Sequence, residues 1–107
     1  MAYLRVQLEP GEAHPFTSGF VLAADGSVRV PLEKRTLVGR QGTCDVVVRS
    51  GQIAREDTVF EPDGAGWAAV NLGTNNGMFV NGKRVLRATL RDGDSIYLYA
   101  VTFVFVA

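Results

Sequence analysis

The chain has few of the residues on which most catalytic and metal sites depend. It contains one cysteine, Cys44, and one histidine, His14, among 107 residues. A single cysteine cannot form an internal disulfide, and the two residues are too far apart in sequence to suggest a metal-binding motif or a nucleophile paired with a base. We therefore expect a protein that is not an enzyme and that has no metal site and no cofactor.

The chain also lacks an excess of charge of either sign. Its 11 Lys and Arg residues balance its 11 Asp and Glu residues, so the formal net charge is zero. This balance argues against a general binder of nucleic acid or of membrane surfaces, because such proteins usually carry a basic excess.

Long apolar segments are absent as well. No apolar run is long enough to cross a bilayer, and residues 1–16 do not have the basic segment and apolar core of a signal peptide. A single cysteine is typical of a reducing compartment. Together these features predict a cytoplasmic protein.

What the sequence does contain is a series of short runs in which apolar and polar residues alternate, separated by turn residues. About eleven such runs predict short strands, and no run has helical periodicity over three turns. The strands are expected at residues 3–8, 20–22, 28–30, 36–38, 45–48, 58–60, 67–70, 78–80, 83–85, 95–99 and 102–106, and a loop is expected at residues 9–18. The pattern predicts an all-β sandwich or barrel, with residues 1–107 forming a single domain.

Two Asn-Gly pairs lie on either side of the apolar triplet 78–80. Asn-Gly favours tight turns because both residues tolerate positive φ. Asn81-Gly82 therefore predicts a two-residue hairpin between 78–80 and 83–85. The other pair, Asn76-Gly77, follows no strand that could pair across it, so residues 75–77 are interpreted as a rigid polar loop of the kind that often binds a partner.

Four segments, taken in order, resemble the forkhead-associated (FHA) domain. They are residues 37–40 (LVGR) with 44–48 (CDVVV), 71–77 (NLGTNNG), 79–82 (FVNG) and 90–98 (LRDGDSIYL). The resemblance implies a two-sheet β-sandwich of mainly antiparallel strands. It also implies a protein-interaction module that binds phosphothreonine peptides through loops at one end of the sandwich, with a protein or peptide as the partner.

The resemblance assigns the phosphopeptide site to Arg40, Arg55, Thr74, Asn75 and Asn76. A phosphate carries nearly two charges and three acceptor oxygens, which a guanidinium can grip. Arg40 matches the arginine that does so in the family; the alternative is an exposed arginine paired with Asp45 or another acid. Arg55 is either a second charged donor or the partner of Glu56 or Asp57 in a salt bridge of little value.

The polar loop supplies the remaining candidates. Thr74 replaces the serine usual in the family, and Asn75 occupies a position where a threonine often touches the phosphate. Asn76 matches the asparagine that holds the backbone of the bound peptide, since its amide can both donate and accept. The alternative role of Asn76 is to stabilise its own turn.

The sequence departs from the family where a Ser-Arg-x-His motif is usual, because residues 54–57 read Ala-Arg-Glu-Asp. Ala54 has no hydroxyl for the phosphate, and an ionised Asp57 cannot donate as the histidine does. A buried Asp57 must accept loop N–H groups, whereas an Asp57 that points into the site would repel phosphate. Ser50 could replace the missing hydroxyl, although a solvated loop serine is the favoured interpretation.

Two hypotheses follow, and a third is weaker. The first is a phosphothreonine-peptide reader. The second is a degenerate FHA domain that binds a folded partner, or its own chain, without phosphate. A purely structural domain is less consistent with the polar loop at Thr74, Asn75 and Asn76.

Overall fold

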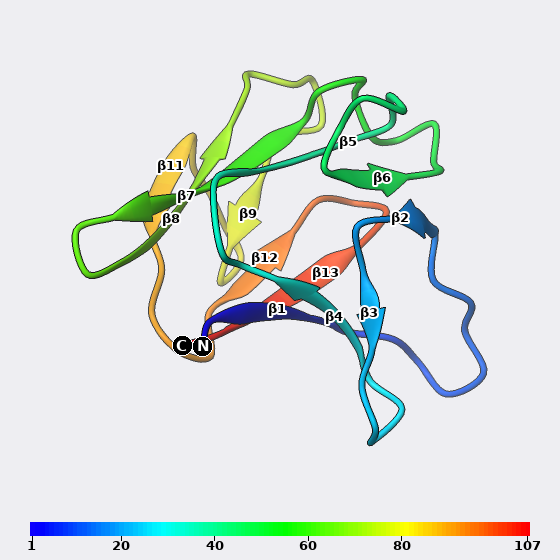
Figure 1. The fold of residues 1–107 in the computed structure, drawn as a ribbon. Helices are drawn as coiled ribbons and strands as arrows, with labels where there is room; N and C mark the ends of the chain where they lie inside the picture. The colour runs from blue at the N-terminus through cyan, green and yellow to red at the C-terminus, as the bar shows by residue number, and fades with distance from the viewer.

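The computed structural model describes all of residues 1–107 and contains thirteen strands and no helix (Figure 1). The strands are β1 (Tyr3–Val6), β2 (Phe16–Ser18), β3 (Val21–Leu22), β4 (Val28–Pro31), β5 (Thr36–Gly39), β6 (Val46–Val48), β7 (Thr58–Asp63), β8 (Gly66–Asn71), β9 (Phe79–Val80), β10 (Lys83–Arg84), β11 (Arg87–Thr89), β12 (Ser95–Tyr97) and β13 (Thr102–Val106). The chain has no helix of the length and apolar character needed to cross a membrane.

The strands form two sheets that pack face to face. One sheet has the order β10-β9-β12-β13-β1-β4-β3 and the other the order β11-β8-β7-β5-β6-β2. Every pair is antiparallel except β5 and β6. Because β1 pairs with the last strand, Tyr3 opposite Val106, the two termini lie side by side (Figure 1). The predicted all-β sandwich of mainly antiparallel strands is confirmed.

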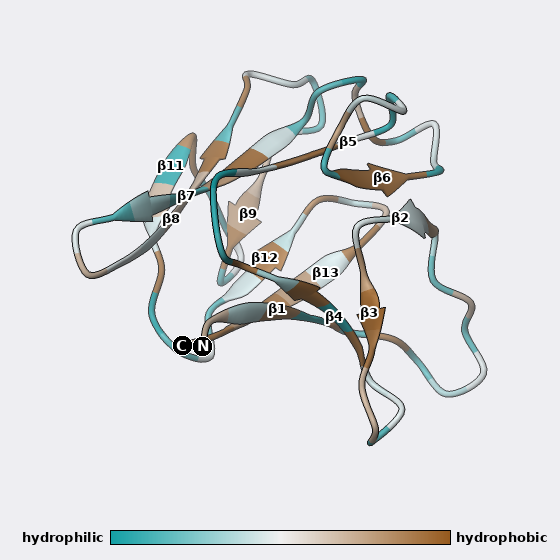
Figure 2. Ribbon diagram, in the orientation of Figure 1, coloured by the Kyte–Doolittle hydropathy of each residue, from teal (hydrophilic) through white to brown (hydrophobic).

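The core lies between the sheets and follows the alternation in the sequence. Along β13, Phe103 and Phe105 are buried while their neighbours are half-buried. The ring of Phe103 meets Phe60 of the other sheet edge to face, with 5.8 Å between centroids. Figure 2 shows the apolar residues concentrated along the strands of both layers and the polar residues in the connecting loops.

Two predictions about single elements need correction. The expected loop at 9–18 contains β2, because Phe16 is buried and pairs with Val48 at the edge of a sheet. β11 was not predicted, since only Ala88 of its three residues is even half-buried. Phe79 is half-buried and packs against Tyr97 and Tyr99, and its neighbour Met78 is buried.

The hairpin at Asn81-Gly82 is present as predicted. Both residues have positive φ, 51° and 81°, and they connect β9 to β10. The Asn81 side chain also donates to Asp94 Oδ1 and accepts the Ser95 N–H, so the turn is fixed to the neighbouring connection.

Candidate functional site

Three loops gather at one end of the sandwich, because of the order of strands in the second sheet. In the pairing register Val38 of β5 lies opposite Thr58 of β7, which lies opposite Asn71 of β8. The end of β5, the start of β7 and the end of β8 are therefore neighbours, and the loops that follow or precede them meet at the top of Figure 1. A hollow of about 460 Å³ lies between these loops and is lined by Arg40, Gly51, Gln52, Ile53, Ala54, Gly73, Thr74, Asn75 and Asn76.

Gly39 allows two of the loops to touch. A Cβ at this position would collide with the carbonyl oxygen of Arg55 and would lie 2.7 Å from Cys44 Sγ. The close approach is held by hydrogen bonds from the Arg40 N–H to Ala54 O (3.0 Å) and from the Gln41 N–H to Arg55 O (3.2 Å). The sequence Gly-Arg therefore brings the arginine beside the loop that contains Ala54.

Cys44 is buried in the same junction. Its thiol donates to Arg55 O at 3.2 Å. Burial raises the pKa of the Cys44 thiol above its ordinary value, since the low-polarity surroundings disfavour the thiolate. The cysteine thus acts as a small apolar residue with a weak donor.

The side chain of Arg40 is exposed and unpaired by any acid. Its Nε donates to Ile53 O at 3.0 Å, which orients the guanidinium toward the hollow and leaves both Nη nitrogens without a partner. Asp45 instead accepts the Leu37 N–H (2.9 Å) and lies 3.7 Å from Lys34 Nζ. The alternative in which Arg40 pairs with Asp45 is therefore wrong.

Asp57 is 2% exposed and does not line the hollow. Its Oδ2 accepts the Ala54 N–H at 3.0 Å and its Oδ1 accepts the Thr58 hydroxyl at 2.8 Å. Of the two alternatives for this residue, the structure has the buried carboxylate that accepts loop donors. Asp57 thus fixes the loop that contains Ala54, from the position where the family usually has a histidine.

Thr58 and Asn71 extend this hydrogen-bond network into the next loop. Asn71 Nδ2 lies 3.4 Å from Thr58 Oγ1 and 3.1 Å from Thr74 Oγ1. Asn71 Oδ1 accepts the backbone N–H groups of Gly73 and Thr74 at 3.1 and 3.2 Å. Asn71 is therefore structural: it ties the loop before β7 to the loop after β8 through their buried sides.

The three polar loop candidates have different surroundings. The Thr74 hydroxyl accepts from Asn71 Nδ2 and from the Gly77 N–H (3.2 Å), so its oxygen is committed to the loop. Asn76 Nδ2 donates to Gln52 O at 2.9 Å and so joins two loops instead of closing its own turn. Asn75 is exposed and its side-chain amide makes no hydrogen bond within the chain, which leaves it free for a ligand.

Arg55 lies beside the hollow and not in its lining. With Arg40 and Gln41 it lines a separate, smaller hollow of about 260 Å³. It forms no ion pair with Glu56 or Asp57, because the salt bridges of the chain are those of Arg29, Lys34 and Arg87. The structure thus brings Arg40, Thr74, Asn75 and Asn76 around one hollow and leaves Arg55 next to it.

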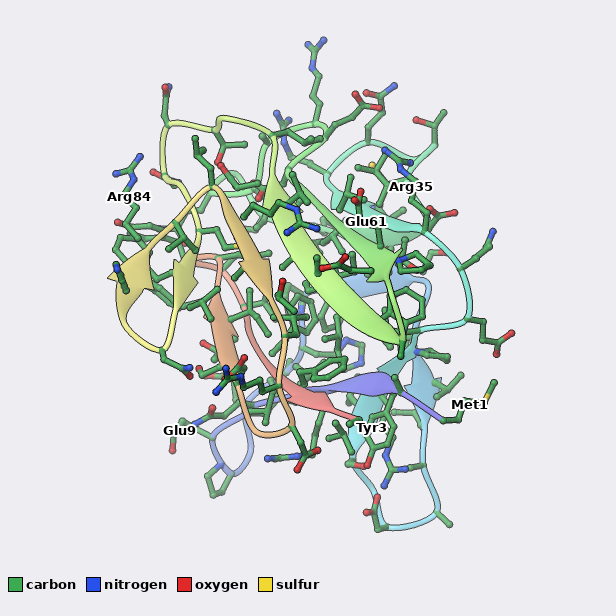
Figure 3. All side chains as sticks on the ribbon, turned by 90° about the vertical axis from the view of Figure 1, so that its left-hand side faces the viewer. Met1, Tyr3, Glu9, Arg35, Glu61 and Arg84 are labelled. Carbon is green, nitrogen blue, oxygen red and sulfur yellow. The ribbon has the colours of Figure 1, made fainter.

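Several site residues carried no signal in the sequence. Gly51, Gln52 and Ile53 line the hollow, although nothing in the segment 49–53 distinguishes it from an ordinary loop. Ser50, considered as a substitute hydroxyl, is absent from the lining and accepts the Gln52 N–H at 3.2 Å. Arg84 of β10, labelled in Figure 3, donates from Nη2 to Asn75 O at 3.3 Å and packs against Gly77, so it supports the polar loop from outside.

The site has no grouping suited to metal chemistry. Nowhere in the chain do three His, Cys, Asp or Glu side chains come together in a way that could hold a metal ion. The hollow is lined by one positive charge, amide and hydroxyl groups, and no acid. Such an arrangement can bind an anion and the backbone of an extended peptide.

Comparisons with known proteins place this geometry in a family. EmbR of Mycobacterium tuberculosis, solved in complex with a low-affinity phosphopeptide, matches with a TM-score of 0.75 and 27% identity over 98% of this chain, which spans 24% of the EmbR chain. The FHA domain of CT664 from Chlamydia trachomatis matches with a TM-score of 0.77 and 18% identity over 99% of this chain and 96% of that chain.

A third solved structure is the FhaA FHA domain complexed with the intracellular domain of Rv3910. It has a TM-score of 0.72 and 19% identity over 98% of this chain and 99% of that chain. A search of curated proteins found no match. The family model of the FHA domain matches residues 36–99, more than half of the sequence. The chain therefore belongs to the FHA domain family.

Proposed function

We propose that residues 1–107 act as one cytoplasmic interaction domain that binds phosphothreonine-containing proteins or peptides in the hollow beside Arg40. The observation that carries the proposal is the guanidinium of Arg40, which is held by Ile53 O through Nε and presents two unpaired Nη nitrogens to a hollow without acids. A phosphate dianion is the ligand that best uses such a fork. The phosphopeptide in the EmbR complex supports this choice.

The other lining residues suit the rest of a phosphopeptide. The free amide of Asn75 can donate to a second phosphate oxygen. Asn76 keeps its Oδ1 and one Nδ2 hydrogen for the peptide backbone after bonding to Gln52 O. Ala54, an apolar member of the lining that is only half-buried, can contact the γ-methyl group, which distinguishes threonine from serine.

Because of Ala54, the domain is expected to bind phosphothreonine peptides weakly. A hydroxyl at this position would add one hydrogen bond to a charged group, worth about 1.5–3 kcal/mol, or roughly ten- to a hundredfold in affinity. The same substitution supports the second candidate function, a domain that binds a folded partner without phosphate. We rank phosphate recognition first because Arg40 and the loop amides remain.

The first test is a binding titration with three libraries of fluorescent peptides that carry phosphothreonine, phosphoserine or threonine at a fixed position. The proposal expects saturable binding of the phosphothreonine peptides, weaker binding of the phosphoserine peptides and none of the threonine peptides. Arg40→Ala should abolish binding. Arg35→Ala removes the same charge from an exposed arginine at the opposite end of β5 and should have no effect.

The second candidate predicts a different result. A complex captured from a lysate by this domain should survive phosphatase treatment if phosphate plays no part. Equal binding of phosphorylated and unphosphorylated libraries would exclude phosphate recognition.

A further inference from the structure

We infer that the smaller hollow between Arg40, Gln41 and Arg55 is a second anion subsite, which takes a phosphoryl group or, less strongly, a carboxylate on the same peptide. The inference rests on the proposed function, because the peptide is expected to place its phosphothreonine in the larger hollow. The ligand class is then a peptide with two neighbouring anionic side chains. The structure places Arg40 in the lining of both hollows, so one guanidinium faces both anions.

The first reason is that the two guanidiniums lack counterions. Arg40 and Arg55 are both exposed, and neither forms a salt bridge. The two aspartates that the sequence offered as partners bond to other groups: Asp45 to Lys34 and the Leu37 N–H, and Asp57 to Ala54 and Thr58.

The second reason is that the backbone under the smaller hollow is fixed. The Arg55 carbonyl accepts both the Gln41 N–H and the Cys44 thiol. The Ala54 carbonyl accepts the Arg40 N–H. The backbone of Arg40, Gln41 and Arg55 is therefore held in place by these hydrogen bonds. An anion bound between the three side chains would order only those side chains and not the loops.

The third reason is the chemistry of the donors. Two guanidinium groups and the Gln41 amide can saturate the three oxygens of a phosphoryl group, whereas a carboxylate offers two oxygens and a smaller charge. An extended peptide advances about 3.3 Å per residue, so side chains within about three residues of the phosphothreonine can reach a hollow that shares Arg40.

Glu56 provides a test of how a nearby negative charge affects anion binding in the smaller hollow. It is the exposed acid next to Arg55, and it forms no ion pair. Its charge opposes an anion in the smaller hollow, so Glu56→Gln should strengthen binding there while Arg55→Gln weakens it.

The experiment measures Kd for phosphothreonine peptides with otherwise uncharged flanks, with and without a phosphoserine at each position from three before to three after the phosphothreonine. A second set carries aspartate at those positions. For the wild-type protein we expect one position at which the second phosphate improves Kd about tenfold and aspartate improves it less. Arg55→Gln should reduce the improvement in Kd from the second phosphate to about twofold. Glu56→Gln should enlarge this improvement, and Arg35→Gln should leave it unchanged.

The outcomes separate this subsite from the proposed function. Binding of the singly phosphorylated peptides that depends on Arg40, with no gain at any position or a gain that survives Arg55→Gln, would overturn the subsite and leave phosphothreonine recognition standing. Failure of every phosphopeptide to bind would overturn both. A gain that Arg35→Gln reduces as much as Arg55→Gln would also overturn the subsite, because it would reflect overall charge.

Discussion

Ala54 and Asp57 both depart from the family motif, yet the structure gives the two departures opposite consequences. Ala54 lines the hollow but has no side-chain donor, so alanine in place of the usual serine weakens binding in the hollow itself. Asp57 lies underneath and accepts the Ala54 N–H and the Thr58 hydroxyl, so the loop stays fixed. The family motif has therefore lost a ligand-contacting hydroxyl at Ala54, whereas at Asp57 a different residue type supports the loop.

Restoring the hydroxyl should strengthen binding. Ala54→Ser places a donor in the lining beside Arg40, and we expect phosphothreonine peptides to bind about ten times more tightly, the scale of one hydrogen bond to a charged group. The measurement is a titration of both proteins with the same peptide. Ala13→Ser, at an exposed loop position away from the hollow, should leave Kd unchanged. An unchanged Kd for Ala54→Ser would mean that phosphate does not lie where we place it.

Removing the support should destabilise the fold. Asp57→Ala leaves the Ala54 N–H and the Thr58 hydroxyl without the acceptor they use, and one such loss costs about 1–3 kcal/mol. Urea denaturation should give a free energy of unfolding lower by that amount. Glu56→Ala, at the adjacent exposed position, should change it by less than about 0.5 kcal/mol. Equal effects of the two substitutions would contradict the role of Asp57.

At the scale of elements, the site depends on the junction between the end of β5 and the loop before β7. Backbone hydrogen bonds from residues 40 and 41 to the carbonyls of residues 54 and 55 join the two loops just past the last residue of β5. This junction requires a residue without a side chain at Gly39, because the Arg55 carbonyl occupies the place of a Cβ.

Gly39→Ala should therefore separate the two loops. We expect a loss of about 1–3 kcal/mol in the free energy of unfolding, the usual cost of overpacking, together with loss of phosphopeptide binding. Gly42→Ala is the matched control, because a Cβ there meets nothing within 4 Å and should leave both quantities unchanged. Chemical denaturation and peptide titration of the two variants provide the measurements. A stable Gly39→Ala protein that still binds would show that the close approach is not needed.

The sequence predicted elements best where a local signal determines them. Asn81-Gly82 defines its hairpin through positive φ alone, and β13 follows from a run of β-branched and aromatic residues. β2 and β11 were missed because both are three-residue strands whose pairing depends on a neighbouring strand. In the same way, the burial of Asp57 could be given only as one of two alternatives, since the pairing of β7 with β5 and β8 decides it.

For the molecule as a whole, the zero net charge conceals a local imbalance. Three arginines, Arg40, Arg55 and Arg84, lie near the polar loops without an ion-pair partner. The acids that neutralise other basic residues are Asp25, Asp45 and Asp63, and none of them lines either hollow. Overall composition therefore excluded a general nucleic-acid binder without revealing the positive end of the sandwich.

Alkaline pH should weaken the whole fold through Cys44. Burial raises the pKa of its thiol above the ordinary value of 9.0, so the folded state holds the proton more tightly than the unfolded state does. The resulting stability is fully present below about pH 9 and is lost as the pH rises through the pKa of the folded state. Urea denaturation at pH 7.5 and 10 should show a larger loss for the wild-type protein than for Cys44→Ala. An equal loss in the two proteins would exclude this role of the thiol.

The most direct test of the central claim is a nuclear magnetic resonance titration of the ¹⁵N-labelled protein with a phosphothreonine peptide and with its unphosphorylated form. The account predicts that only the phosphorylated peptide shifts backbone amide signals, and that the shifts concentrate at Arg40, at residues 51–55 and at residues 73–76. Shifts of the same size with both peptides, or shifts confined to strands away from these loops, would contradict it.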